Sequence, residues 1–339
     1  MGWWQVSADT LAGSRFVISP LAEATASLIT LARGTAAHPA ERDWLKSHKP
    51  AYQALLAADP VAAALQRAGI GPCWIADIFS QPPAGDDDEA FAAELARVRA
   101  IPLDAALADL AIAVGGPVPA ILRRPDLPER AAGLLQWAWE RMIAPAWPQR
   151  RRILEADIIA RTSLLARGGW SAALAGIGPG TRWLGEGRLR INAHDSPPRD
   201  IAGAQLFFVP VTQRAGWVAW QEPHRYALMY QCSGALAEGP GRVPVPETLS
   251  ALLGPARARV LVLLDSPLST TQLVALTGLA LGSVGRHVQV LHAAGLLGRS
   301  RAGRSVLYYR TAAGDTLVAA QAARLSNACL IKEGAAASM

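Results

Sequence analysis

The stretch Ser269-Thr270-Thr271-Gln272-Leu273-Val274-Ala275-Leu276-Thr277 decides how the C-terminal part of the chain folds. It reads as a short helix, because Ser269 is a favourable N-cap residue and Gly278 ends the pattern. A second helix is predicted from about Gly282 to Ala293, and Gly295 closes it. Since only three or four residues separate the two helices, the sequence predicts a helix-turn-helix.

The second of these helices has an apolar face and an opposite, polar face. Its apolar residues Val284, Val288 and Leu291 fall within about 40° of one another, so we expect them to face the core. The opposite face carries small or polar side chains, namely Gly282, Ser283, Arg286, Gln289 and Ala293. This pattern predicts a helix that packs on one side and leaves the other side free to contact a ligand.

The polar face suits the major groove of DNA. Arg286 has the donors to bond guanine, and the amide of Gln289 can bond adenine. Small residues at the start of the helix would let it approach the groove closely. His287 lies at the boundary of the two faces, where it would contact either a phosphate or the body of the domain.

A basic hairpin is predicted directly after this helix. Two β-like runs, Leu296–Arg301 and Arg304–Arg310, flank Ala302-Gly303. Four arginines decorate the runs, namely Arg299, Arg301, Arg304 and Arg310. Such a hairpin would straddle the phosphate backbone or enter a minor groove, although a solvated basic hairpin is the alternative.

The combined pattern over residues 249–311 resembles the ArsR-type winged-helix family. The similar pieces are the helix opening at Ser269–Leu273, the recognition helix at Leu281–Leu291, and Ala294-Gly295-Leu296-Leu297 with Arg304–Tyr309. The resemblance implies a winged helix-turn-helix that binds double-stranded DNA. The residues expected to contact DNA are Thr270, Thr271, Gln272, Gly282, Ser283, Arg286, His287, Gln289, Arg299, Arg301, Arg304 and Ser305.

The resemblance also implies a homodimer, formed through flanking helices at about 247–264 and 313–331. A two-fold dimer would bind a pseudo-palindromic operator. Because members of the family usually repress transcription, the resemblance implies a repressor. The sequence departs from the family at the metal sites. Residues 270–277 contain no Cys, and residues 314–330 lack paired Asp and His ligands, so no metal and no cofactor are expected.

Charge and aromatic residues divide the chain into two chemically different regions. Residues 247–339 carry nine basic and four acidic groups, a net charge of +5, whereas the first 246 residues carry a net charge of only +1. All eleven Trp lie between Trp3 and Trp220. We therefore expect a domain at 1–245 and a DNA-binding domain at 246–331, joined by a Gly/Pro-rich linker at about 234–246.

The expected fold class is mainly α (α+β), with a small β subdomain in the N-terminal domain. Helical periodicity covers residues 21–31 and segments near 51–68, 89–99, 103–114, 129–143 and 150–167. Strand patterns cover 181–184, 188–191, 206–211, 216–220 and 226–230. The stretch Ser14–Glu23 resembles the start of long regulators whose N-terminal domain has no characterised role.

The role of the N-terminal domain is left open between a ligand pocket and a structural body. Its many Trp would line a small-molecule pocket or simply fill the core. No Walker loop, HExxH or GxSxG motif occurs, so no enzyme is expected, with an N-terminal catalytic domain or a protein-interaction module as alternatives. Three scattered cysteines indicate no disulfide framework. Without an apolar run of membrane-spanning length or a signal peptide, a cytoplasmic protein with no membrane partner is expected.

Overall fold

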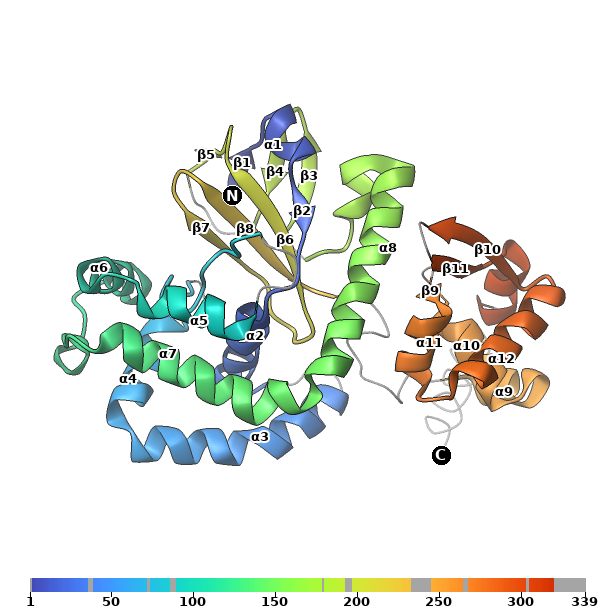
Figure 1. The fold of residues 1–339 in the computed structure, drawn as a ribbon, viewed down its shortest axis with the longest axis horizontal. Helices are drawn as coiled ribbons and strands as arrows, with labels where there is room; N and C mark the ends of the chain where they lie inside the picture. Colours follow the sequence, from blue (N-terminus) through green and yellow to red (C-terminus); the bar gives the residue numbers. More distant parts are fainter. Residues whose placement is uncertain are drawn as a thin grey trace, which may run out of the picture. The chain divides into compact units, whose positions relative to one another are not determined.

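The computed structural model describes residues 2–35, 39–71, 74–85, 90–178, 180–192, 197–232, 245–264, 268–302 and 305–319. The chain divides into two units, which we call the N-terminal unit (Met1–Ala237) and the C-terminal unit (Glu238–Met339). Both units contain helices and small sheets (Figure 1), so the fold is α+β and mainly helical, as the sequence predicts. Most of the predicted linker at 234–246 lies outside the described residues.

A four-stranded sheet forms the middle of the N-terminal unit. Its strands lie in the order β2 (Arg15–Phe16), β6 (Gln205–Val211), β8 (Arg225–Gln231) and β7 (Trp217–Gln221). β6 and β8 are parallel, whereas β7 pairs antiparallel with β8 and forms an edge of the sheet. Nearly every residue of β6 and β8 is buried, so this sheet is covered on both faces.

The alternation of side chains along β6 shows what covers each face. Leu206 and Phe208 pack into an apolar cluster with residues of a second, smaller sheet. Phe207, Val209 and Val211 pack into another cluster built largely from helices. The unit therefore has three layers, with the central sheet between the small sheet and the helices.

The small sheet has the strand order β3 (Arg182–Gly185), β4 (Arg188–Arg190), β1 (Trp3–Gln5) and β5 (Arg199–Asp200). The predicted hairpin of β3 and β4 is confirmed, with Trp183 paired to Leu189. The sequence did not predict β1, which pairs with β4 on one side and with β5 on the other. A strand of three residues is too short to show a period.

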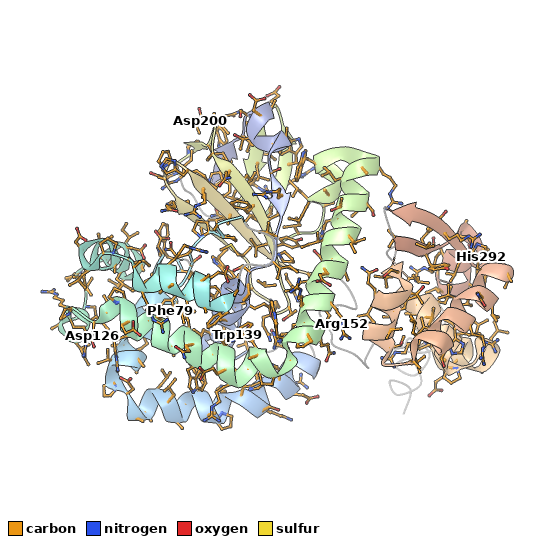
Figure 2. The ribbon with its side chains drawn as sticks, viewed as in Figure 1. Phe79, Asp126, Trp139, Arg152, Asp200 and His292 are labelled. Carbon is orange, nitrogen blue, oxygen red and sulfur yellow. The ribbon has the colours of Figure 1, made fainter. Side chains whose placement is uncertain are left out.

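The helical layer gathers on one side of the central sheet (Figure 1). Its helices are α2 (Pro20–Arg33), α3 (Pro39–Ala58), α4 (Pro60–Gly69), α5 (Phe91–Arg99), α6 (Leu103–Val114) and α7 (Leu127–Ala138). A π-helical turn (Trp139–Ile143) and a 3-10 turn (Ala144–Ala146) lead into α8 (Trp147–Ala173), and α1 (Ala8–Ala12) and a 3-10 turn at Ala120–Leu122 complete the unit. Figure 2 shows Phe79 and Trp139 within this layer, where Phe79 is fully buried and Trp139 stacks on Phe91 with ring centroids 4.5 Å apart.

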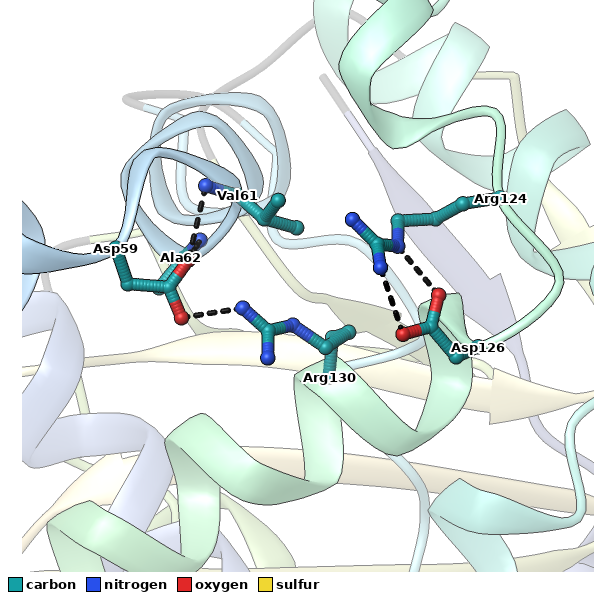
Figure 3. A network of polar contacts seen from close by, with 6 residues as sticks. All are labelled: Asp59, Val61, Ala62, Arg124, Asp126 and Arg130. Atoms are coloured by element: carbon teal, nitrogen blue, oxygen red, sulfur yellow. Dashed lines mark hydrogen bonds and ion pairs between the residues drawn. The ribbon is translucent and has the colours of Figure 1, made fainter.

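The structure corrects the predicted helix near 51–68. The helix begins at Pro39, and the segment is divided at Asp59, where α3 ends and α4 begins. The Asp59 carboxylate accepts hydrogen bonds of 3.0 Å from the backbone N–H groups of Val61 and Ala62, and Arg130 of α7 binds its other oxygen (Figure 3). Burial acts against the ionised form, but these partners outweigh it and lower the pKa of Asp59. An N-cap Asp before Pro60 therefore starts a new helix.

Arg124 and Asp126 form a second ion pair nearby, at the start of α7 (Figure 3). Both groups lie at the surface, and the guanidinium binds both carboxylate oxygens. The hydrogen bond from Arg124 is the main cause that lowers the pKa of Asp126.

The C-terminal unit begins with α9 (Glu247–Leu253) and α10 (Pro255–Leu263). It continues with β9 (Leu268–Ser269), α11 (Thr270–Thr277), α12 (Leu281–Ala293), β10 (Leu297–Ala302) and β11 (Ser305–Arg310). The three strands form one sheet in the order β10-β11-β9. Residues 312–319 are helical, and the remainder of the helix predicted at 313–331 lies outside the described residues.

Within the described part of the chain, no helix combines the length and the apolar character that crossing a membrane requires.

Candidate functional site

The start of α11 is held by a reciprocal pair of hydrogen bonds between Ser269 and Gln272. The Ser269 hydroxyl accepts from the backbone N–H of Gln272 at 3.3 Å, and the Gln272 side-chain oxygen accepts from the backbone N–H of Ser269. This capping box confirms Ser269 as the N-cap. It also places Gln272 in the interior, where only 7% of its surface is exposed. The Gln272 side chain therefore caps the helix and is not exposed for the DNA contact that the sequence predicts. Thr270 is half-buried, and the side chain of Thr271 lies outside the described residues.

The turn between α11 and α12 depends on Gly278. This glycine ends α11 with a φ of 71°, in the left-handed region that disfavours other residues. The next helix then begins at Leu281, after Ala280, whose side chain makes no capping bond. The first N–H groups of α12 therefore have no side-chain acceptor at the N-cap.

The two faces of α12 are those that the sequence predicts. Val284, Val288 and Leu291 are at most 1% exposed and pack into the core of the unit. The residues expected to contact DNA from this helix are on the other side, and Gly282, Ser283, Arg286 and Gln289 are all exposed. His287 is half-buried at the boundary. At Gly282 and Gly285 an added Cβ would meet nothing within 4 Å, so this face is open.

The predicted hairpin is present, and its two strands pair from Leu297 opposite Arg310 to Ala302 opposite Ser305. Leu307 is buried and pairs with Ser269 of β9, so the base of the hairpin is tied to the start of α11. Arg299 is exposed on β10. The side chains of Arg301 and Ser305, and Arg304 as a whole, lie outside the described residues.

The sequence predicts that Arg310 is one of four arginines exposed on the hairpin, but the structure shows that Arg310 binds other residues of the C-terminal unit. Its guanidinium donates to the backbone carbonyls of Leu261 and Val262, and it also binds Asp315 at 2.7 Å. It therefore fastens the hairpin to the C-terminal end of α10.

A cavity of about 440 Å³ lies in the N-terminal unit, at the edge of the central sheet formed by β7. Four tryptophans line it, namely Trp4, Trp74, Trp217 and Trp220. Among the described residues, the charged side chains in its lining are Arg33, Asp77 and Arg199. We call it the aromatic cavity.

Asp77 and Trp220 also line a second cavity of about 340 Å³, together with Asp109. The Asp109 carboxylate accepts from the backbone N–H of Asp77 and from the indole N–H of Trp74 at 3.4 Å. Burial and, to a smaller extent, the neighbouring Asp109 raise the pKa of Asp77 to about 7, although the charge of Arg199 opposes the shift. The pKa of Asp109 is raised as well, chiefly by burial. The two carboxyl groups form an acidic pair beside the aromatic cavity.

The sequence analysis missed this acidic pair. Asp77 follows the apolar run Trp74-Ile75-Ala76, and Asp109 interrupts the otherwise apolar second half of α6. A single carboxylate within an apolar run is the signal that could have identified each residue, but their proximity depends on the tertiary fold.

Two loops carry further polar side chains, which form no catalytic cluster among the described residues. Glu222 forms an ion pair with Arg199, His224 is exposed, and His194 and Asp195 lie outside the described residues. Among the residues that the structure describes, no group of three or more His, Cys, Asp or Glu side chains could hold a metal ion. Cys232 is a buried free thiol, whereas Cys73 and Cys329 are not among the described residues.

A comparison with protein-family models, with curated proteins and with solved structures found no match for the chain.

Proposed function

We propose that the C-terminal unit is a winged helix-turn-helix domain and that the protein is a sequence-specific, DNA-binding transcriptional regulator of the ArsR type. The observation that carries the proposal is the division of α12 into a buried apolar face and an exposed face with Ser283, Arg286 and Gln289. A helix placed in this way after a turn and before a hairpin can enter the major groove while its apolar face stays in the core.

In this proposal α12 reads base edges. Arg286 binds guanine and Gln289 binds adenine, while exposed Gly282 and Ser283 allow the first turn to approach the groove closely. The uncapped N–H groups at the start of α12 favour a phosphate oxygen, because a helix N-terminus attracts anions.

The hairpin and the start of α11 supply contacts to the phosphate backbone in this proposal. Arg299 is exposed for such a contact. The sequence assigns Thr270, Thr271, Arg301, Arg304 and Ser305 the same role. The net charge of +5 in residues 247–339 suits a polyanionic partner.

The proposed regulator is a homodimer that represses from a pseudo-palindromic operator in the cytoplasm. Accessible apolar side chains support a second copy as the partner of the C-terminal unit. Leu252 of α9 is 63% exposed, and Leu317 and Val318 in the helix at 312–319 are only half-buried. These residues belong to the two flanking segments through which the family resemblance implies dimerisation.

The test is a fluorescence-anisotropy titration of the full chain onto DNA from upstream of its own gene, at two salt concentrations. We expect specific binding by two chains per operator, with an affinity that falls steeply with salt. Arg286→Ala should lose about 1–3 kcal/mol of discrimination between operator and random DNA, because one base contact is removed.

The matched control is Arg141→Ala, which removes an exposed arginine from the N-terminal unit and should bind like the wild type. Weak binding that is indifferent to sequence, together with an unchanged Arg286→Ala variant, would contradict the proposal. Binding by one chain per site would contradict the dimer.

A further inference from the structure

We propose that the aromatic cavity of the N-terminal unit binds an aromatic amine, a flat aromatic or heteroaromatic ring that carries an alkylammonium group, with Asp77 as its counter-ion. The ring would lie against Trp74, Trp217 and Trp220, and the ammonium group would meet the acidic pair. This site goes beyond the proposed DNA binding and does not depend on it.

Hydrogen bonds hold the indoles of Trp74 and Trp217 in place, and the Arg199 guanidinium covers one face of Trp220. The N–H of Trp217 donates to the Ser80 hydroxyl, and the N–H of Trp74 donates to Asp109. Trp74 and Trp220 pack edge to face, with centroids 5.5 Å apart and an interplanar angle of 80°. Such fixed indoles form rigid apolar walls that suit a flat ring, and they attract cations through their faces.

None of the three cavity-lining tryptophans named above is fully buried, although each packs against other parts of the unit. A cavity of about 440 Å³ is large enough for a two-ring compound and falls in the usual size range of small-molecule sites. The indoles therefore line a space and do not simply fill the core.

The Asp77 carboxylate is the group that selects a cation. Within the described part of the chain it makes no hydrogen bond and no ion pair, although its backbone atoms do. Asp109 lies beside it, so the pair offers a surplus of negative charge. A half-buried carboxylate that makes no hydrogen bond or ion pair gains from a ligand that brings a charged donor.

The two arginines of the cavity are already engaged. Arg199 lies over the ring of Trp220, 4.3 Å from its centroid, and forms an ion pair with Glu222. Arg33 donates to the carbonyl of Arg214, and its pKa is lowered by burial and by the charge of Arg214. These arrangements favour a cation at Asp77 over an anion at the arginines.

The test uses three probes that share one ring system, namely tryptamine, indole and indole-3-acetate, titrated onto the full chain and followed by calorimetry. We expect tryptamine to bind about tenfold more tightly than indole, because of one charge-assisted contact. Indole-3-acetate should bind most weakly. Equal affinities, a preference for the acid, or no binding by any probe at millimolar concentration would overturn the proposal.

The pH dependence supplies a second readout. The charged groups that face Asp77 are Asp109, Arg199 and Glu222, with Arg33 elsewhere in the cavity wall. Since the pKa of Asp77 is about 7, a cation must displace a proton at low pH. The affinity for tryptamine should therefore rise between pH 6 and pH 8, while the affinity for indole stays constant. An unchanged tryptamine affinity over this range would contradict Asp77 as counter-ion.

Variants separate recognition from folding. Asp77→Asn should reduce tryptamine affinity to that of indole and leave indole binding unchanged, which an unfolded variant could not do. Asp104→Asn is the matched control, because Asp104 is exposed on α6, the helix that carries Asp109. Trp220→Leu should weaken all three probes together. The assignment of Asp77 as counter-ion would be overturned if Asp104→Asn lost the preference for tryptamine over indole, or if Asp77→Asn kept it.

Discussion

Asp77 and Asp109 lie close together, and burial opposes the ionisation of both carboxyl groups. The carboxylate of Asp109 accepts hydrogen bonds from the backbone of Asp77 and from the ring of Trp74, so it also stabilises the loop that carries these two residues. The half-buried carboxylate of Asp77 makes no hydrogen bond within the described part of the chain, and the charge of Asp109 opposes its ionisation. The hydrogen bonds of Asp109 therefore offset part of the free energy that ionisation costs, which Asp77 lacks.

We expect Asp77→Asn to stabilise the N-terminal unit at pH 8 and to have little effect at pH 4. The pKa of Asp77 rises from 3.8 to about 7 on folding, so the contribution of the protonated carboxyl is fully present below pH 4 and is lost as the pH rises through 7. A shift of this size corresponds to roughly 2–4 kcal/mol. Urea unfolding followed by Trp fluorescence at pH 4 and pH 8 measures it.

The companion variant Asp109→Asn should gain less stability at pH 8 than Asp77→Asn. Burial raises the pKa of Asp109 as well, but its backbone and indole donors would lose a charged acceptor, which costs about 1–3 kcal/mol. The same unfolding experiment reports both variants. If both stabilise the unit equally, Asp109 does not have the supporting role that its hydrogen bonds indicate.

Among the helices and strands, the sequence predicts those that are long and periodic and misses those that depend on distant partners. The helix start at Ser269 follows from local capping chemistry, and the N-cap is present. The strands β6, β7 and β8 follow from apolar runs bounded by turns. β1 and β2 are three and two residues long, and they exist only because residues far along the chain pair with them.

The same distinction applies to the candidate sites. The two faces of α12 are predictable because helical periodicity assigns each side chain to a face. The interior position of Gln272 is not predictable from its polarity, since a capping box draws it inward. The acidic pair is beyond sequence reasoning, because thirty-two residues separate its members.

Another buried carboxylate shows why such groups are hard to identify from sequence. Glu23 on α2 is fully buried, yet it accepts hydrogen bonds from Thr212 and binds Arg150 of α8 at 2.7 Å. Its position in an apolar helical stretch resembles that of Asp109. Only the fold shows that Glu23 forms an ion pair, whereas Asp77 forms none among the described residues and feels the charge of Arg199 at longer range.

We expect Ser269→Ala to destabilise the C-terminal unit by about 1 kcal/mol, because α11 loses its N-cap acceptor. The loss should appear in unfolding followed by far-ultraviolet circular dichroism. Ser250→Ala on α9 is the control, since Ser250 is not an N-cap residue. Equal losses in the two variants would indicate that the cap contributes nothing beyond an ordinary serine.

At the scale of the whole molecule, each unit has an apolar core of its own. Leu249, Leu261 and Val288 are buried in the C-terminal unit, and the clusters on the two faces of the central sheet belong to the N-terminal unit. All eleven Trp belong to the N-terminal unit. Fluorescence therefore reports one unit, and circular dichroism reports both.

We expect the two units to unfold as separate cooperative transitions, because each buries its own core. Ser269→Ala should shift the circular dichroism transition of the C-terminal unit and leave the Trp fluorescence transition in place. Asp77→Asn should shift the Trp fluorescence transition at pH 8 and leave the circular dichroism transition of the C-terminal unit in place. If either variant moves the transitions of both units equally, the chain unfolds as a single unit.

The place of β1 in the small sheet has a consequence for synthesis on the ribosome. Trp4 is fully buried and pairs with Leu189, which leaves the ribosome 185 residues later. At a synthesis rate of about 5–20 residues per second, the first strand waits roughly ten to forty seconds for its neighbours. During that time Trp3 and Trp4 lack the strand neighbours that they have in the folded unit. The strand β1 thus reaches its final place long after its own synthesis, and its two tryptophans are accessible to a chaperone during the delay.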